Sequence, residues 1–242
     1  MKCDIFIRSY NKDCEWLKYC VKSIEKYAKG FNNVIITYPD GHDCCNHSFA
    51  KNFPIKEICS NGYIDQQLTK LSAHKYCNDD VTHILYVDSD ACFTETVSPD
   101  LFMKNGLPII YMTPYSSFIS DYELPALKWK FITENIIGVN VEYEFMRRSP
   151  FLYLKRTLID FQNWFTNKYN TSIENYVVSM IQPQLSEYNA LGAYIYYIGD
   201  KNQYLFINTL EYLPPQPSFF LQNWSWGGLT KDMEKKLIEI TS

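Results

Sequence analysis

The chain alternates short apolar runs with segments whose apolar residues recur at helical spacing. Residues 3–10 (CDIFIRSY) and 33–38 (NVIITY) are apolar runs that predict strands buried on both faces. The segment 14–28 lies between them and has apolar residues at a 3.6-residue period, with Asp13 as the expected N-cap and Gly30 as the expected C-cap. Together these segments predict a β-α-β unit with parallel strands and a right-handed crossover.

The remaining pattern predicts more elements of both kinds. Residues 41–60 read as irregular, apart from the Pro39-Asp40-Gly41 turn that opens them. Helices are expected over 63–77, 150–166, 172–181, 187–197 with Ser186 as N-cap, and 230–240. Strands are expected at THILYVDSD (82–90), 107–112, within 128–145 around IIGVNVEYEF, and at 204–213. The sequence therefore predicts one α/β domain over 1–242, with a Rossmann-like, mostly parallel central sheet flanked by helices. Residues 1–95 would bind a nucleotide, and 96–242 would shape an acceptor site.

Composition narrows the class of partner. The net charge is −4 and no long Lys/Arg block occurs, which argues against electrostatic nucleic-acid binding. The apolar runs are too short to span a bilayer, and the N-terminus reads as a strand rather than a signal peptide. The 8 cysteines are therefore expected to be reduced and mostly buried in a cytoplasmic protein, in the host cytoplasm if the source is a virus.

The motif Asp88-Ser89-Asp90 carries the predicted chemistry. It follows the apolar strand residues 84–87, so both acids emerge at the carboxyl edge of the sheet, where open α/β sheets bind ligands. Carboxylate oxygens suit Mg²⁺ or Mn²⁺, and such an ion can neutralise the charge on a leaving diphosphate. An Asp-x-Asp pair alone is also common in solvated turns, but here it ends an apolar strand and a β-α-β unit opens the chain.

The chain resembles GT-A glycosyltransferases in the order of its elements. These are a strand (DIFIRSY), a helix, a strand (VIITYPD), a second helix (GYIDQQLTKLSA) and the segment HILYVDSD. The stretches MRRSPFLYLKRT, LSEYNALGAYIYY and QNWSWGG resemble a small branch of uncharacterised bacterial and large-DNA-virus sugar transferases. The resemblance spans most of the chain. It implies a nucleotide-diphospho-sugar donor, most often UDP-linked, and a glycan or other hydroxyl acceptor.

The resemblance also implies roles for particular residues. Asp88 and Asp90 match the metal pair, and Glu187 matches the acid that takes the acceptor proton in inverting members. The donor would be bound by Ser9, Tyr10, Asp40, Lys70 and Ser89. Ordinary turn or surface roles compete with these assignments, and for Glu187 the competing role is a favourable acid in a first helical turn.

Acceptor binding is expected in the second half of the chain. Its candidates are Arg147, Arg148, Trp224 and Trp226, whose guanidinium groups and indole rings suit phosphates and sugars, although solvated arginines and core tryptophans are the plain alternatives. All 4 histidines precede the acid pair, so a third metal ligand is not evident. The segment 42–47 (HDCCNH) is expected to be a loop rather than a zinc site, because adjacent cysteines rarely bind one tetrahedral ion.

Three other functions stay open. A retaining glycosyltransferase of the same fold would not use Glu187 as a base. A sugar-nucleotide nucleotidyltransferase normally opens with a Gly-rich loop, and no glycine precedes Gly30 here. A non-catalytic carbohydrate-binding protein would not need an intact acid pair.

Overall fold

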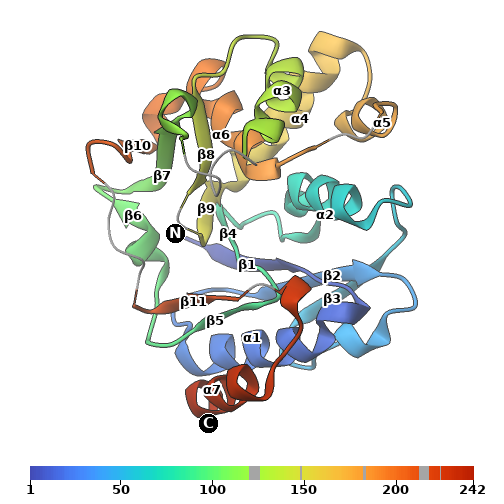
Figure 1. Ribbon diagram of the computed structural model, residues 1–242, viewed down its shortest axis with the longest axis vertical. Coiled ribbons are helices and arrows are strands. Elements are labelled where there is room, and N and C mark those ends of the chain that lie inside the picture. The colour runs from blue at the N-terminus through green and yellow to red at the C-terminus, as the bar shows by residue number, and fades with distance from the viewer. Residues whose placement is uncertain (120–125, 148, 182–183, 213–217, 224) are drawn as a thin grey trace.

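The computed structural model describes residues 1–119, 126–147, 149–181, 184–212, 218–223 and 225–242. Its central sheet has five strands, and the three pairings among its first four are parallel, while the last strand is antiparallel (Figure 1). In spatial order they are β3 (Lys51–Ile55), β2 (Val34–Pro39), β1 (Cys3–Arg8), β4 (His83–Tyr86) and β9 (Phe151–Leu154). The predicted α/β class with a mostly parallel sheet is confirmed.

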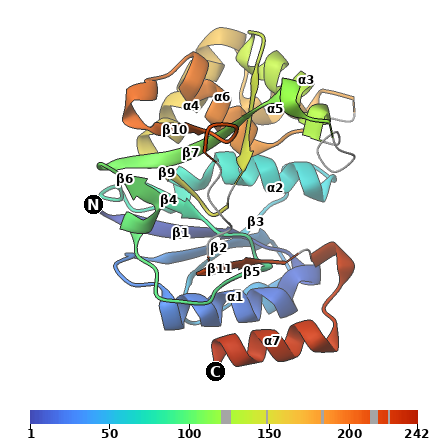
Figure 2. The same cartoon turned by 60° about the vertical axis from the view of Figure 1, so that its left-hand side comes forward.

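Helices cover both faces of this sheet (Figures 1 and 2). Because strand side chains alternate, Ile5 and Ile7 of β1 pack with the first helix, while Phe6 packs in the opposite core. One face carries α1 (Cys14–Tyr27), on which α7 (Lys231–Thr241) packs. The other face carries α2 (Gly62–Leu71), α4 (Lys155–Tyr169) and α6 (Glu187–Tyr197), with α3 (Leu127–Ile137) and α5 (Ile173–Val178) beyond them. That core joins residues from both halves of the chain.

Two smaller sheets complete the fold. β7 (Leu107–Pro114) pairs in parallel with β10 (Leu205–Asn208), and antiparallel with β6 (Met103–Lys104) and β8 (Tyr143–Arg147). β5 (Ala91–Phe93) pairs antiparallel with β11 (Phe220–Gln222). Since β5 directly follows Asp90, this last pair brings a C-terminal segment beside the acidic motif.

Several predicted elements differ from the observed ones. Part of the irregular region 41–60 forms β3, whose polar, proline-containing sequence hides its pairing with β2. The region expected as strands within 128–145 begins instead with α3, because packing on α6 outweighs the strand preference of its isoleucines. The predicted helix 150–166 begins with β9, an apolar run whose periodicity does not separate strand from helix. Asp13 occupies the N-cap position of α1, but its side chain makes no capping bond.

The position of α6 depends on a glycine at its contact with β8. A Cβ atom on Gly192 would lie 2.4 Å from the Cβ atom of Phe145, a buried residue. We therefore expect Gly192→Ala to cost about 1–3 kcal/mol of unfolding free energy, because the packed core must shift. Urea unfolding measures this loss. Gly62→Ala is the matched control, since its Cβ meets nothing within 4 Å and the change should stabilise α2 slightly; equal effects of the two changes would contradict the packing argument.

The cysteine expectation is wrong for one pair. Cys14 and Cys44 form a disulfide, while the other six cysteines are free. Spacing alone did not reveal that the start of α1 and the loop after β2 lie side by side at one sheet edge. The expected loop in this region is present and includes a short 3₁₀ helix, η2 (Asp43–Cys45). A cytoplasmic location stays a prediction.

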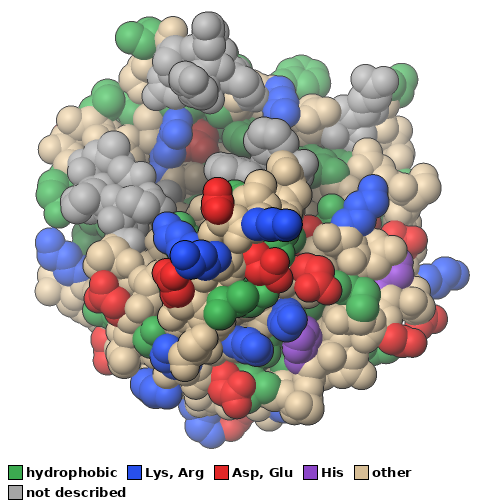
Figure 3. All heavy atoms as spheres, turned by 60° about the horizontal axis from the view of Figure 1, so that its bottom comes forward, with side chains coloured by type: hydrophobic (Ala, Val, Ile, Leu, Met, Phe, Trp, Pro, Cys, Tyr) green, Lys and Arg blue, Asp and Glu red, His purple; other side chains and the backbone are tan. Residues whose placement is uncertain are grey.

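Two surface properties bear on possible partners. Within the described ranges, each helix is too short or too polar to cross a bilayer. The face that includes α7 carries acidic and basic side chains interspersed with one another (Figure 3).

Candidate active site

A cavity of about 540 Å³ lies at the carboxyl edge of the parallel strands. It is lined by residues that follow β1 and β4, by one side of α2, by the start of α6 and by the segment after β11. Seven of the sequence-predicted site residues line it: Ser9, Tyr10, Lys70, Asp88, Ser89, Asp90 and Glu187. Parallel strands place their following loops at one edge, which explains why residues so far apart in sequence meet here.

Lys70 joins two of the predicted acids inside the cavity. Its Nζ atom lies 2.6 Å from Asp88 Oδ1 and 3.0 Å from Glu187 Oε1. The side chains of Lys70, Asp88 and Glu187 are 4%, 28% and 2% exposed, so Asp88 alone presents much surface to solvent. Burial by itself lowers the pKa of Lys70, but the two carboxylates raise it by more, so the ammonium stays charged.

Glu187 begins α6 as predicted. Ser186 is the N-cap, and its Oγ atom accepts a hydrogen bond from the backbone N–H of Asn189 at 3.3 Å. Burial raises the pKa of the Glu187 carboxyl, and the Lys70 ammonium opposes that rise. A carboxylate with a raised pKa is a stronger base than an exposed glutamate, so this environment suits proton abstraction.

Asp90 is tied to the segment after β11. Its Oδ1 atom accepts a hydrogen bond from Gln222 Nε2 at 2.7 Å, and its Oδ2 atom accepts one from the Ser225 backbone N–H at 2.9 Å. The backbone and side-chain N–H groups of Asn223 donate to its carbonyl oxygen. Burial, and then the charge of Asp88, raise the pKa of Asp90 to about 6. The ionised form of Asp90 is therefore disfavoured, by burial first and by the neighbouring carboxylate second.

Asp13 is a third acid that the sequence reasoning assigned to a helix cap. It is buried and lines the cavity, and its Oδ2 atom accepts a hydrogen bond from Ser89 Oγ at 3.0 Å. Burial is the main cause that raises its pKa, and the charge of Asp88 adds to the rise. The sequence feature that could have placed Asp13 in the site is its position after β1, because the loop after β1 reaches the same sheet edge as the acidic motif.

The three aspartates offer the hard oxygen ligands that Mg²⁺ or Mn²⁺ prefers. Their mutual repulsion contributes to the raised pKa values, and a bound cation would remove it. Asp88 Oδ1 pairs with Lys70, but each carboxylate oxygen has a second lone pair for a cation. In the described part of the chain, the oxygens of the three aspartates do not all lie within 4.8 Å of one another, so the aspartates would have to approach one another to share an ion. Their chemistry therefore fits the predicted ion, although the structure does not gather them.

Aromatic side chains form another wall of the cavity. Tyr63 and Trp129 both line it, and Trp129 Nε1 donates a hydrogen bond to Tyr63 Oη at 3.0 Å. Tyr63 in turn donates to the carbonyl oxygen of Leu185, next to the N-cap of α6. Sequence reasoning missed this pair, because neither residue stands in a motif. Rings with a polar tip suit the apolar face and hydroxyl groups of a sugar.

The remaining predicted residues lie elsewhere or outside the described residues. Asp40 is exposed, does not line the cavity, and accepts a hydrogen bond from the Gly41 backbone N–H, as a turn residue does. Arg147 also does not line it; its guanidinium lies 5.0 Å from the centre of the Phe118 ring. Arg148, Trp224 and the side chain of Trp226 lie outside the described residues.

Glu144, beside the predicted acceptor region, gives a pH test of the fold. Burial raises its pKa to about 7, against a smaller lowering by Arg147, whose Nε atom is 3.2 Å from Oε2. The unfolded chain releases this proton near pH 4.5, so between about pH 4.5 and 7 the unfolded state binds fewer protons and stability falls as pH rises. We expect the unfolding free energy of the wild type to fall by about 1–3 kcal/mol as pH rises across that window. The unfolding free energy of Glu144→Gln should not show this fall, because glutamine does not titrate.

Urea unfolding at about pH 5 and about pH 8 measures this difference. Glu142→Gln is the matched control, because that side chain is exposed. Parallel pH profiles for the wild type and Glu144→Gln would contradict a buried, proton-binding Glu144.

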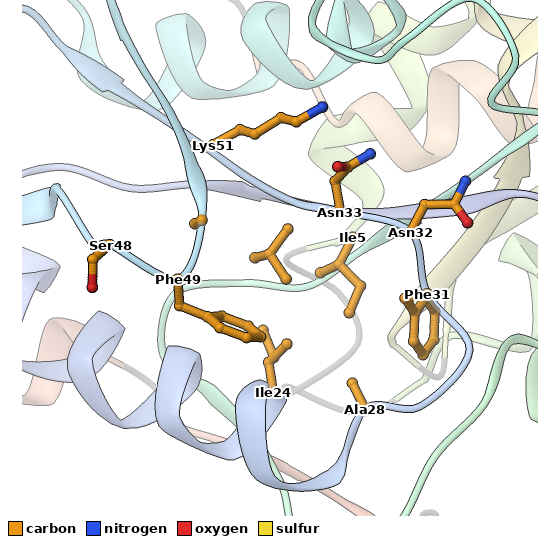
Figure 4. A pocket seen from close by; sticks show the side chains of 11 residues that line it. Ile5, Ile24, Ala28, Phe31, Asn32, Asn33, Ser48, Phe49 and Lys51 are labelled. Atoms are coloured by element: carbon orange, nitrogen blue, oxygen red, sulfur yellow. The ribbon is translucent and has the colours of Figure 1, made fainter.

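A second cavity, of about 370 Å³, lies between α1, the start of β2 and the loop before β3. Its lining mixes apolar and polar residues, and the one charged lining residue is Lys51, whose ammonium points away from the apolar side chains (Figure 4). It contains none of the predicted catalytic groups.

Comparison with protein-family models gives no match for this chain, and comparison with curated proteins gives no significant match. The resemblance to GT-A glycosyltransferases therefore rests on the quoted motifs.

Proposed function

We propose that the chain is a metal-dependent glycosyltransferase of the GT-A kind. It would transfer a sugar from a nucleotide-diphospho-sugar, with UDP-linked donors the first to test, to a glycan or another hydroxyl acceptor. The observation that carries the proposal is the single cavity at the carboxyl edge, which is lined by Asp13, Asp88 and Asp90 together with Lys70 and Glu187. Acids for a cation, a fixed positive charge and a candidate base are the groups that this reaction needs.

On the donor side, Asp88 and Asp90 would hold Mn²⁺ or Mg²⁺, with Asp13 as the third carboxylate. The ion, when bound, supplies positive charge that stabilises the leaving nucleoside diphosphate. Ser9 and Tyr10 also line the cavity and would contact the nucleoside. Lys70 would keep Asp88 oriented through their ion pair.

On the acceptor side, Glu187 would accept the proton of the attacking hydroxyl group. Its raised pKa favours this role, and the Ser186 cap holds the start of α6 in place. Tyr63 and Trp129 would position the acceptor sugar ring. These assignments describe inverting transfer, in which the hydroxyl attacks on the face opposite the leaving phosphate.

Retaining transfer is the second candidate, and one observation favours it. Glu187 is 2% exposed and pairs with Lys70, which also holds Asp88. A carboxylate in that position could serve only to hold Lys70 beside the donor, without reaching an acceptor hydroxyl. The product anomer separates the two candidates.

The deciding experiment is a hydrolysis and transfer screen with UDP-, GDP- and dTDP-sugars, with Mn²⁺ and with EDTA, followed by anomeric analysis of the product. Release of nucleoside diphosphate that requires the metal supports the proposal. A parallel assay would supply a nucleoside triphosphate and a sugar phosphate. Release of pyrophosphate in that assay would favour a nucleotidyltransferase. Sugar binding without turnover of any donor would favour a carbohydrate-binding protein.

A further inference from the structure

A cluster of three cysteines lies next to the active-site cavity and takes no part in the proposed reaction. Cys14 begins α1 and is bonded to Cys44 in η2. The free thiol of Cys45 lies with its Sγ atom 3.2 Å from Cys14 Sγ, so it touches the disulfide. The three sulfur atoms lie within 4.8 Å of one another. A disulfide with a third sulfur in contact is the arrangement from which thiol–disulfide exchange proceeds.

The three sulfurs differ in their access to solvent. Cys44 is exposed, Cys14 is partly buried and Cys45 is fully buried. A reductant in solution can therefore reach Cys44, whereas Cys45 can be reached only from within the protein. The Cys45 Sγ atom contacts Ser9 Oγ at 3.8 Å, and the residue packs in the core between the sheet and α1. Cys45 should therefore stay in place whether or not the Cys14–Cys44 disulfide is intact.

We infer that Cys14, Cys44 and Cys45 form a thiol–disulfide exchange site, in which the Cys14 sulfur can bond to either Cys44 or Cys45 and which a small dithiol reduces at Cys44.

The internal step needs no other reactant, and the reductive step needs only the dithiol, which is oxidised as the protein disulfide is reduced. In the internal step, the Cys45 thiolate attacks Cys14 Sγ, the Cys14–Cys44 bond breaks, and Cys44 leaves as a thiolate that takes up the proton Cys45 had lost. In the reductive step, one thiolate of the dithiol attacks Cys44 Sγ and Cys14 leaves as a thiolate. The second thiol then displaces Cys44, so two protein thiols and one oxidised dithiol result.

The site is connected to the active-site cavity through short contacts. Asp13 directly precedes Cys14 and accepts a hydrogen bond from Ser89 within the acidic motif. His42 lines the cavity, and its carbonyl oxygen accepts a hydrogen bond from the Cys45 backbone N–H at 3.0 Å. Loss of the Cys14–Cys44 bond would therefore loosen residues 41–44 beside the cavity.

The far end of the same loop is held separately. The Asn52 side chain donates to the carbonyl oxygens of His47 and Ala50 and accepts from the His47 backbone N–H. Phe49 lies beside Ile24 of α1 in the second cavity (Figure 4). Residues 47–52 should therefore keep their protection when the disulfide opens, which confines the expected change to the first part of the loop.

Thiol counts after air oxidation and denaturation test the exchange. The wild type, with eight cysteines and one disulfide, should show six free thiols. In Cys44→Ser, seven cysteines remain and Cys14 should bond to Cys45, which leaves five. In Cys14→Ser neither disulfide can form, so all seven remaining thiols should be free. Cys92→Ser is the control: it keeps the Cys14–Cys44 disulfide and should show five free thiols. Seven free thiols in Cys44→Ser, or eight in the wild type, would overturn the inference.

Reduction of the folded protein by a dithiol gives a second, independent measurement. Opening a native disulfide should lower the melting temperature of the wild type by roughly 5–15 °C. Hydrogen exchange should accelerate over residues 41–44 and stay unchanged over 47–52. Cys14→Ser should show neither change on reduction. A wild type whose melting temperature and exchange do not respond to the dithiol would show that the site is inert. Neither experiment depends on sugar transfer, so failure here is distinct from failure of the proposed function.

Discussion

Replacement of Asp90 by asparagine is expected to reduce sugar transfer by at least about 100-fold, because a cation clamp on a leaving diphosphate contributes several kcal/mol to the reaction. The change keeps the size of the side chain and one acceptor oxygen for Gln222 or Ser225. It removes the negative charge that the cation would need. Calorimetric titration with UDP should correspondingly show the loss of Mn²⁺-dependent affinity, which is a readout separate from turnover.

The fold should tolerate this change. Because burial and the Asp88 charge raise the pKa of Asp90, its ionised form is costly near neutral pH, and asparagine removes that cost. The melting temperature of Asp90→Asn should therefore equal or exceed that of the wild type, as is common where catalysis holds an unfavourable charge. Asp100→Asn, an exposed acid outside the cavity lining, is the matched control and should change neither property. A folded Asp90→Asn protein with full turnover in EDTA would exclude the metal-dependent mechanism.

The sequence predicted those site residues whose positions depend only on a neighbouring strand or helix end. The apolar run 84–87 must be buried, so Asp88 and Asp90 had to emerge at the carboxyl edge, and the cap at Ser186 followed from local chemistry. The pairing of Lys70 with both Asp88 and Glu187 depends on how α2 and α6 pack, which periodicity does not encode.

Other features could not be predicted, because the local sequence fits more than one structure. Asp13 fits a helix cap by position, yet its side chain turns to Ser89, since the acidic loop after β4 lies within reach. The strand β3 contains a proline and two polar or charged residues, and it forms because β2 offers a free edge. The disulfide likewise depends on the start of α1 and the loop after β2, which are far apart in sequence and meet only in the folded chain.

Glu187→Gln is expected to lower turnover with acceptor by about 10²–10⁴-fold, because glutamine keeps the shape of the side chain but cannot take the acceptor proton. Affinity for the nucleotide-sugar should stay nearly unchanged, since Lys70 keeps its ion pair with Asp88. Rates are compared per folded molecule after measurement of the melting temperature, so that a loss of folded protein is not counted as lost catalysis.

Glu15→Gln is the matched control for this change. Like Glu187, Glu15 lies in the first turn of a helix, where the helix dipole favours an acid, but it is exposed on α1 and does not line the cavity. If the role of Glu187 were only to stabilise a helix start, both substitutions would lower the melting temperature slightly and leave turnover intact. If Glu187→Gln keeps near-normal turnover and the product keeps the anomeric configuration of the donor, Glu187 serves to hold Lys70 and the retaining mechanism replaces the inverting one.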